Sequence, residues 1–258
     1  MDKISVISKL DDKSISIKEY IIKKLVDKGY IYDEEQPDLV FTVGGDGTFL
    51  YAVHKYLEII DKVFFIPIHN GTLGFVAEYT ASEVDECLKN DFTNDVKRIY
   101  KYPLLECELD SGKKFYAVNE IRAESIRFSQ NIDVFINQQY FESFRGNGIL
   151  VCTQFGSTAY NRSLNGAVID AGVPCIEMTE IAGLSHSNYR SCRSSIIFKN
   201  TTEIVLNNKN YDGISLIYDQ FEFKLTKEKS LKIKQCSKEV KMLSFKNIPY
   251  LTRIKYLF

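Results

Sequence analysis

The spacing of apolar residues changes near residue 97, and this change constrains the fold more than any other feature of the sequence. Before that point, short apolar runs alternate with segments of helical spacing, as in Ile17, Ile21 and Leu25. Strands that alternate with helices predict right-handed crossovers and a mainly parallel sheet. We expect the strands of this sheet at 3–8, 39–43 and 63–68.

Beyond residue 97, apolar and polar residues alternate in many short runs separated by turn residues. This texture is typical of a dense β region such as a sandwich. The stretch 157–189 is expected to interrupt the strands, and it begins with a short helix that ends at Asn165-Gly166. The expected strands are 103–109, 114–121, 132–136, 148–153, 196–199, 203–207, 214–218, 221–225, 231–235 and 239–245.

The change of spacing therefore predicts two domains in a chain of 258 residues, which is long enough to hold both. The first is an α/β domain over 1–98 and the second is a β-rich, sandwich-like domain over 99–245. The expected fold class is α+β overall.

Charge and cysteine usage exclude several classes of protein. The 33 basic and 34 acidic residues give a net charge of −1, so no basic surface points to nucleic acid or to an anionic membrane. Six cysteines without a CxxC pair and three histidines give no spacing for structural zinc. The first ten residues lack the apolar core of a signal peptide, and no apolar run is long enough to span a membrane. We therefore expect a soluble, cytoplasmic protein with free thiols.

The stretch VGGDGTFL, residues 43–50, follows a predicted buried strand and opens a predicted helix. Ligands of α/β proteins bind at this end of a parallel strand. The loop lacks the spacing and the lysine of a Walker P-loop and does not fit GxGxxG. We expect Gly44, Gly45 and Gly47 to adopt positive φ and to expose main-chain N–H groups, and Thr48 to cap a helix that begins at Phe49.

Asp46 places a negative charge among glycines that suit a phosphate, and two interpretations of it are open. In the first, Asp46 belongs to an Asp-Gly turn and only caps the helix. In the second, its carboxylate accepts the proton of an acceptor hydroxyl in phosphoryl transfer, where catalysis is mainly positioning and charge neutralisation. N–H groups and Mg²⁺ would then hold the donor phosphates and offset the repulsion.

Four motifs in order along the chain resemble the NAD kinase family. They are GGDGTFL (44–50), IHNGTLGF (68–75), NE (119–120) and FRGNGILVCTQFGSTAYNRSLNGAVI (144–169). The resemblance implies an N-terminal α/β domain that the chain end, 246–258, completes, and a β-rich NAD-binding domain. It also implies transfer of a phosphate from ATP, or from polyphosphate, to the adenosine 2′-hydroxyl of NAD, with a divalent cation that is usually Mg²⁺.

The resemblance also assigns roles to residues. Asp46 is the implied catalytic proton acceptor, and the donor-phosphate loop consists of Gly44, Gly45, Gly47 and Thr48. No metal ligand is assigned. The implied NAD-binding residues are Asp46, Gly47, Asn119, Glu120, Arg145, Asn147, Thr158, Ala159, Tyr160, Asn161, Ser163, Ala182 and Gln220. The family also implies self-association to a dimer or tetramer, with Ala182, Tyr189 and Arg190 at contacts between subunits.

Two departures from the family pattern are visible. Asn147 stands where the family usually has aspartate, and TQFG replaces TPTG, with Gln154 and Phe155 as the changed residues. Two alternatives stay open at this point. A lipid kinase of the diacylglycerol type shares the GGDGT loop, although HNGTLGF replaces its usual GTGNDFAR-like segment. A non-catalytic dinucleotide-binding protein derived from the kinase is the second, although a pure binder gains nothing from Asp46.

Overall fold

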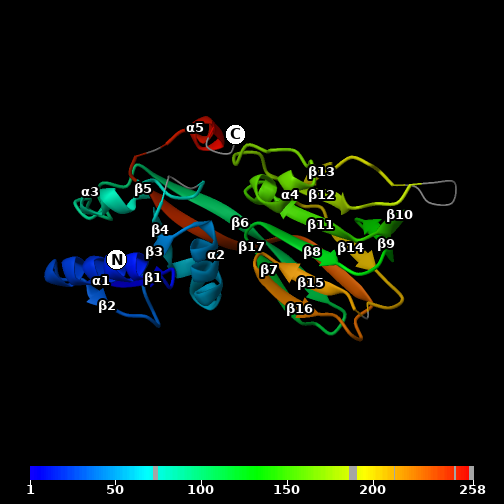
Figure 1. The fold of residues 1–258 in the computed structure, drawn as a ribbon, viewed down its shortest axis with the longest axis horizontal. Coiled ribbons are helices and arrows are strands. Elements are labelled where there is room, and N and C mark those ends of the chain that lie inside the picture. Colours follow the sequence, from blue (N-terminus) through cyan, green and yellow to red (C-terminus); the bar gives the residue numbers. More distant parts are fainter. Residues whose placement is uncertain (72–74, 186–190, 212, 247, 256–258) are drawn as a thin grey trace. The chain divides into compact units, whose positions relative to one another are not determined.

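The computed structural model describes residues 1–71, 75–185, 191–211, 213–246 and 248–255. The chain divides into two compact units (Figure 1). Unit 1 consists of Met1–Tyr102 with Lys238–Phe258, and unit 2 consists of Pro103–Ser237. The sequence places these boundaries at 98/99 and 245/246. Two long strands, β6 and β17, contribute residues to both units, because the chain changes unit within each of them.

Unit 1 contains the predicted parallel sheet. Its strands run in the order β2-β1-β3-β4, and each neighbouring pair is parallel. The C-terminal part of β17 adds to β4 in the same direction, as does the short β5. The strand bounds are β1 Lys3–Ser8, β2 Ile31–Tyr32, β3 Leu39–Gly44, β4 Phe64–His69 and β5 Tyr79–Thr80. The expected strands at 3–8, 39–43 and 63–68 are thus confirmed.

The two main helices of unit 1 cover opposite faces of this sheet. Ile21 and Leu25 of α1 pack in one core cluster with Ile66 of β4, while Phe49 of α2 meets Phe65, the neighbouring residue of β4, edge to face at 5.8 Å. Because successive residues of a strand point to opposite faces, the helices lie on opposite sides. The bounds are α1 Asp12–Asp27, α2 Asp46–Lys55, α3 Val84–Cys87 and α5 Tyr250–Lys255.

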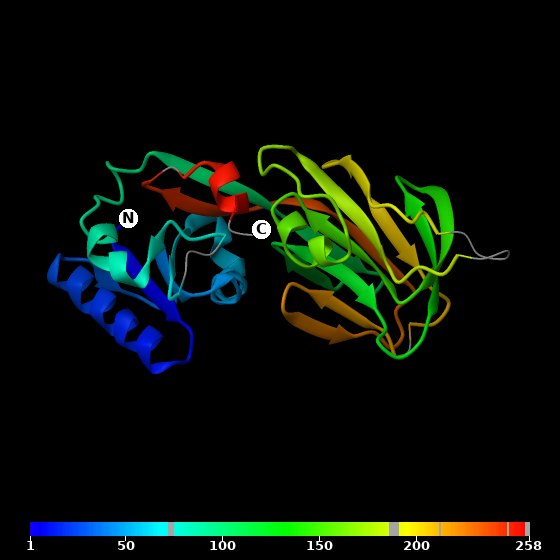
Figure 2. The ribbon, with the colours of Figure 1, turned by 45° about the horizontal axis from the view of Figure 1, so that its top comes forward.

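Unit 2 is a sandwich of two antiparallel sheets. One contains β10-β9-β14-β17, with β6 beside β17 and β7 beside β6, and the other is β13-β12-β11-β8-β15-β16. A single core cluster takes apolar residues from both sheets. Figure 2 shows α4 over the outer side of β11, where Tyr160 and Leu164 pack on Leu150.

The strands of unit 2 alternate with short turns. Their bounds are β6 Arg98–Leu109, β7 Lys114–Ala117, β8 Glu120–Glu124, β9 Gln130–Ile136, β10 Gln139–Gly146, β11 Gly148–Thr153, β12 Cys175–Ile181, β13 Ile196–Lys199, β14 Ile204–Asn207, β15 Ser215–Tyr218, β16 Phe221–Lys224 and β17 Ser230–Ser244. A helical turn, Gly156–Thr158, precedes α4, Tyr160–Ser163.

Two expectations about unit 2 were wrong. The stretch 157–189 does not simply interrupt the strands, because it contains β12, whose Glu177 and Glu180 disguise the run of apolar residues. The runs 231–235 and 239–245 belong to one strand, β17, because Cys236-Ser237-Lys238 between them contains no turn-forming glycine, proline or asparagine. Among the described helices, none has the length and apolarity needed to cross a bilayer.

Candidate active site

The GGDG loop of unit 1 joins β3 to α2 with almost no intervening chain. The strand ends at Gly44, and α2 begins at Asp46 with Gly45 as its N-cap and no side-chain cap. The expectation that Thr48 caps a helix beginning at Phe49 is therefore wrong, since Thr48 lies inside the first turn. Gly44 is needed because a Cβ there would lie 2.3 Å from the Thr48 Oγ1.

The glycines of this loop are less unusual in conformation than expected. Of Gly44, Gly45 and Gly47, only Gly44 has a positive φ, and its value of 159° is close to extended backbone. The loop therefore relies on close approach and on the free N–H groups of a helix start, not on left-handed conformations.

Asp46 does not cap its own helix. Its carboxylate instead accepts hydrogen bonds from the main-chain N–H groups of Val76 and Phe75, in the segment that follows β4. The residue is exposed at the loop surface, yet crowding by neighbouring protein atoms raises the pKa of its carboxyl group. The two N–H groups, together with His69 and Arg253, act in the opposite direction. The interpretation of Asp46 as a simple helix cap is therefore wrong.

In unit 2, the pair Asn119–Glu120 lies just before and at the start of β8. The carboxylate of Asp219, in the β15–β16 turn, accepts hydrogen bonds from the N–H groups of Val118 at 2.9 Å and Asn119 at 2.7 Å. In return, the Asp219 N–H donates to the Glu120 main-chain oxygen at 3.1 Å. Asp219 was not predicted, because its partners lie about a hundred residues away and no local motif marks it.

Glu120 is a buried carboxyl group, 5% exposed, and its Oε2 has no hydrogen-bond partner among the described residues. Burial is the main reason that the pKa of Glu120 rises to about 8. The negative charge of Asp219 adds to the rise and Arg122 opposes it. An orphaned buried acceptor is costly unless a ligand donates to it, so Glu120 is a candidate binding group.

The TQFG turn packs directly against Asn119. Thr153 donates through its N–H to the Asn119 oxygen at 2.9 Å, and its hydroxyl donates to the Val118 oxygen at 2.7 Å. Gly156 follows, and a Cβ there would lie 2.1 Å from the Asn119 oxygen. The structure thus joins the NE pair and the GSTAYN segment in unit 2. The changed Gln154 is used internally, since its Oε1 accepts from Gln235 at 3.2 Å.

Asn161 differs from the other residues of GSTAYN because its side chain points into unit 2. It is fully buried, its Nδ2 donates to Glu177 at 2.8 Å, and its Oδ1 accepts from the Thr179 hydroxyl at 2.7 Å. Glu177 also accepts from the Ala167 N–H at 2.8 Å. The side chain of Asn161 is therefore engaged in holding α4, in contrast to the expected lining of an adenosine pocket.

The rest of the segment is more open. Thr158, Ala159 and Tyr160 are partly exposed, and Ser163 is exposed. The Thr158 hydroxyl donates to the Phe155 oxygen at 3.2 Å. The Arg122 guanidinium lies 4.3 Å from the centre of the Tyr160 ring, so this ring has one face against a cation.

A second group of predicted residues gathers at the ends of β10 and β12. The Asn147 N–H donates to the Ile181 oxygen at 2.9 Å, and the Leu184 N–H donates to the Arg145 oxygen at 2.8 Å. These bonds place Ala182, which is exposed with φ of 48°, beside Arg145 and Asn147.

Another predicted residue, Gln220, lies apart from this group. It is exposed in the β15–β16 turn, next to Asp219. Tyr189 and Arg190 lie outside the described residues.

One group of side chains in the described part of unit 2 has ligand atoms close enough to hold a metal ion. It consists of Glu142, Glu180 and Cys192. The Cys192 thiol donates to Glu142 at 3.3 Å, and the pKa of Cys192 rises to about 12, mainly by burial. A protonated thiol is not a ligand for Mg²⁺, which prefers oxygen, so this group does not match the expected cation.

Comparison with known proteins decides the family. Residues 119–245 match the family model of the ATP-NAD kinase C-terminal domain. A NAD kinase of Latilactobacillus sakei subsp. sakei (strain 23K) is 31% identical over 99% of this chain and 97% of its own length. One from Geobacillus stearothermophilus is 32% identical over 98% and 95%. The chain belongs to the NAD kinase family.

Solved structures agree in fold. Yeast NADH kinase, complexed with NADH, has a TM-score of 0.82 at 19% identity and covers 99% of this chain and 86% of its own. The Archaeoglobus fulgidus NAD kinase in complex with ATP has a TM-score of 0.78 at 19% identity, covering 99% and 97%. The two-domain α+β fold is thereby confirmed. As an NAD kinase, the protein is a phosphotransferase that acts on NAD, and the lipid-kinase alternative is wrong.

Proposed function

We propose that Asp46 is the proton acceptor of this NAD kinase and that ATP is its phosphate donor. The observation that carries the proposal is the carboxylate of Asp46, which is held by two main-chain N–H groups and not used as a helix cap. In the reaction, Asp46 takes the proton of the adenosine 2′-hydroxyl while that oxygen attacks the terminal phosphorus. The bond from phosphorus to its bridging oxygen breaks, and ADP and NADP are the products.

The N–H groups at the start of α2, near Gly45 and Gly47, are placed to bind donor phosphates. A divalent cation, expected to be Mg²⁺, commonly takes one or two carboxylates together with substrate phosphates. Such a cation would be held at the GGDG loop through oxygens of the donor phosphates, because a carboxylate that coordinates Mg²⁺ is a poor proton acceptor and Asp46 is assigned that role. When bound, it would neutralise charge on the phosphates, while Asp46 holds and moves the proton.

We assign binding of NAD to residues of unit 2. The unpaired Oε2 of Glu120 requires a donor such as a ribose hydroxyl. Asn119 is fixed beside it by Asp219, and the exposed groups at the start of the GSTAYN segment supply further contacts. Asn161 supports these residues from inside. The proposed NAD-binding residues of unit 2 are Asn119, Glu120, Arg145, Asn147, Thr158, Ala159, Tyr160, Ser163, Ala182 and Gln220, with Asn161 behind them, and those of unit 1 are Asp46 and Gly47.

We also propose that the protein works in the cytoplasm as a dimer or tetramer. The exposed Ala182, with its left-handed backbone at the end of β12, supports a contact between subunits there. Light scattering at micromolar concentration tests this assembly, and a fully active monomer would contradict it.

The role of Asp46 is tested by Asp46→Asn. Wild-type protein with Mg²⁺, ATP and NAD should form NADP. Turnover of the variant should fall by a factor of roughly 10² or more, the usual contribution of a positioned general base. Its melting temperature should stay close to that of the wild type, because an amide oxygen still accepts an N–H.

Asp38→Asn is the matched control. Asp38 also accepts two main-chain N–H groups, those of Asp2 at 2.8 Å and Lys3 at 3.1 Å, but it lies outside the loop. Turnover of this control should not change. Near-wild-type turnover of Asp46→Asn would reject the catalytic role, and replacement of ATP by polyphosphate in the same assay identifies the donor.

A further inference from the structure

The peptide group that joins Phe75 to Val76 is hydrogen-bonded on both sides within unit 1. Its N–H, that of Val76, donates to the carboxylate of Asp46, as does the N–H of Phe75 in the preceding peptide group. Its carbonyl oxygen, that of Phe75, accepts from one nitrogen of Arg253 at 2.9 Å, and the same nitrogen donates to the Val76 oxygen at 2.7 Å. Arg253 is thus one peptide group away from Asp46, although the two residues lie far apart in the sequence.

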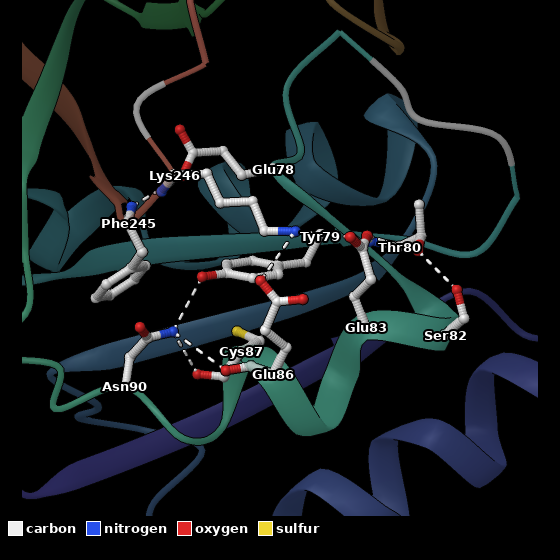
Figure 3. A network of polar contacts seen from close by, with 10 residues as sticks. All are labelled: Glu78, Tyr79, Thr80, Ser82, Glu83, Glu86, Cys87, Asn90, Phe245 and Lys246. Carbon is white, nitrogen blue, oxygen red and sulfur yellow. Dashed lines mark hydrogen bonds and ion pairs between the residues drawn. The ribbon is translucent and has the colours of Figure 1, made fainter.

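Arg253 is itself held by a buried ion pair. Its second terminal nitrogen lies 3.0 Å from Glu78 Oε1, and the two side chains are 7% and 6% exposed. Glu78 in turn accepts from the Ser244 hydroxyl at 2.6 Å and from the N–H groups of Phe245 at 2.9 Å and Lys246 at 3.1 Å. Figure 3 shows Glu78 directed at the main chain of Phe245 and Lys246, where β17 ends. Every oxygen of this buried carboxylate therefore has a partner.

The helix that carries Arg253, α5, is fixed by aromatic contacts as well. Tyr250 packs edge to face on Phe75 at 5.9 Å, and the Arg253 guanidinium lies 5.7 Å from the centre of the Tyr100 ring on β6. Figure 2 shows α5 alongside the unit 1 parts of β6 and β17. The end of the chain is thus packed onto the segment that supplies the donors of Asp46.

We propose that Arg253 is a positioning residue for Asp46, acting through the peptide group between Phe75 and Val76. One nitrogen of its planar fork holds two carbonyl oxygens while the other holds Glu78, a fixed arrangement that the single nitrogen of a lysine does not reproduce. The peptide group is then oriented so that the Val76 N–H meets the Asp46 carboxylate. This inference rests on the proposed role of Asp46 as proton acceptor.

Loss of this arrangement should change the titration of Asp46. The groups that act on it are His69 from β4, Arg253 from α5 and the two N–H groups after β4, and all of them favour the ionised form. Weakening the hold of Arg253 on the Phe75 oxygen weakens the hydrogen bond from the Val76 N–H to Asp46, so the pKa of Asp46 rises. The acid limb of the rate profile should then move to higher pH.

The test is Arg253→Lys, which keeps the charge and loses the fork. We expect a fall in kcat of about tenfold, in line with the cost of a slightly misplaced catalytic group. The KM for NAD should change by less than about threefold, because substrate binding is not affected. The acid limb of kcat should shift to higher pH. A variant with wild-type kcat and an unshifted acid limb, or with only a lower melting temperature, would overturn the proposal.

Lys246→Met is the matched control from the same network. It removes the ion pairs of Lys246 with Glu83 and with Glu86, the latter at 3.3 Å, but keeps the main-chain N–H that Glu78 accepts. Its kcat and pH profile should match the wild type. If Arg253→Lys does not fold, Glu78→Gln leaves Arg253 in place with a weaker anchor, and it should show the same shift of the acid limb with a smaller fall in kcat.

Combination with Asp46→Asn separates the two claims. If Arg253 acts through Asp46, Arg253→Lys should cause no further fall in kcat when Asn occupies position 46. An equal tenfold fall in both backgrounds would overturn the positioning role while leaving that of Asp46 intact. Full turnover of Asp46→Asn alone would instead reject the proposed function of Asp46.

Discussion

Two carboxyl groups, Asp46 in unit 1 and Glu120 in unit 2, have raised pKa values for the same main reason, which is burial or crowding by protein. Their hydrogen bonds differ. The protein itself supplies donors to Asp46, through the peptides of Phe75 and Val76. The described residues supply none to the Oε2 of Glu120, which is nearly inaccessible to water.

The difference separates a group positioned for chemistry from a group positioned for binding. Asp46 is held in one orientation at an exposed loop, so it is ready to receive a proton. The unsatisfied oxygen of Glu120 lowers the stability of the folded protein, and a hydrogen bond from a ligand hydroxyl would remove this loss. The predictions below test this contrast, from the largest expected effect to the smallest.

The largest effect is expected from Gly156→Ala in unit 2, compared with Gly44→Ala in unit 1. The added Cβ at Gly156 would meet the main-chain oxygen of Asn119 at 2.1 Å, whereas at Gly44 it would meet the Thr48 hydroxyl, a side-chain atom, at 2.3 Å. Main chain cannot move aside as a hydroxyl can, so Gly156→Ala should cost roughly 3 kcal/mol and Gly44→Ala about 1 kcal/mol. Denaturant unfolding measures both, and equal losses would contradict the packing of the TQFG turn on Asn119.

The pH dependence of stability should follow Glu120. Its pKa is raised from 4.5 to about 8 in the folded protein, so the folded state holds its proton more tightly. The stability that this gives is complete below about pH 4.5 and is lost as pH rises through about 8. Between these two pH values, Glu120→Gln should therefore become more stable relative to the wild type as pH rises, by up to about 1.4 kcal/mol per pH unit. Parallel stability curves for the two proteins would show that Glu120 is not desolvated.

The same variant should bind NAD less well. With its amide nitrogen at the position of Oε2, a glutamine at position 120 cannot accept there, and the ribose hydroxyl left without an acceptor costs about 1–3 kcal/mol. Calorimetry should show NAD affinity about 10 to 100 times weaker, although the protein is no less stable. If Glu120→Gln binds NAD as tightly as the wild type, the ribose does not contact Glu120.

The smallest effect is expected from Asn147→Asp. The Asn147 Nδ2 donates to the Ser125 oxygen at 2.9 Å, and a carboxylate cannot do so. Restoring the family's aspartate should therefore cost about 1 kcal/mol of stability and should not improve NAD binding. Asn208→Asp is the control, because the Asn208 side-chain oxygen accepts from the Asn210 N–H at 3.1 Å and a carboxylate keeps that bond. A tighter NAD titration for Asn147→Asp would contradict this prediction.

Much of the fold could be predicted because short-range patterns determine it. The buried strands of unit 1 and the helix that carries Ile17, Ile21 and Leu25 are readable from spacing alone. β12 was hidden because Glu177 is buried in it, and a buried carboxylate is recognisable only once its partners Asn161 and Ala167 are known. The prediction of two strands at 231–235 and 239–245 was wrong because polar residues interrupt the apolar run inside β17, although no turn residue does.

The site was predictable where motifs carry it and not where distant segments meet. The motifs marked Asp46, Asn119 and Glu120. Asp219 and Arg253 were missed, because the first contacts main chain about a hundred residues away and the second contacts Phe75, Val76 and Glu78 from the far end of the chain. No local sequence pattern encodes such contacts, so only the folded chain shows which residues orient the carboxylates.

The contrast between the two carboxyl groups is tested most directly by measuring NAD affinity and NADP formation on Asp46→Asn and Glu120→Gln side by side. We expect Asp46→Asn to bind NAD nearly as well as the wild type and to turn over roughly 10² times more slowly. Glu120→Gln should instead bind NAD weakly and approach wild-type turnover when NAD is saturating. If both variants lose affinity and turnover in the same proportion, the division between a reacting and a binding carboxylate is wrong.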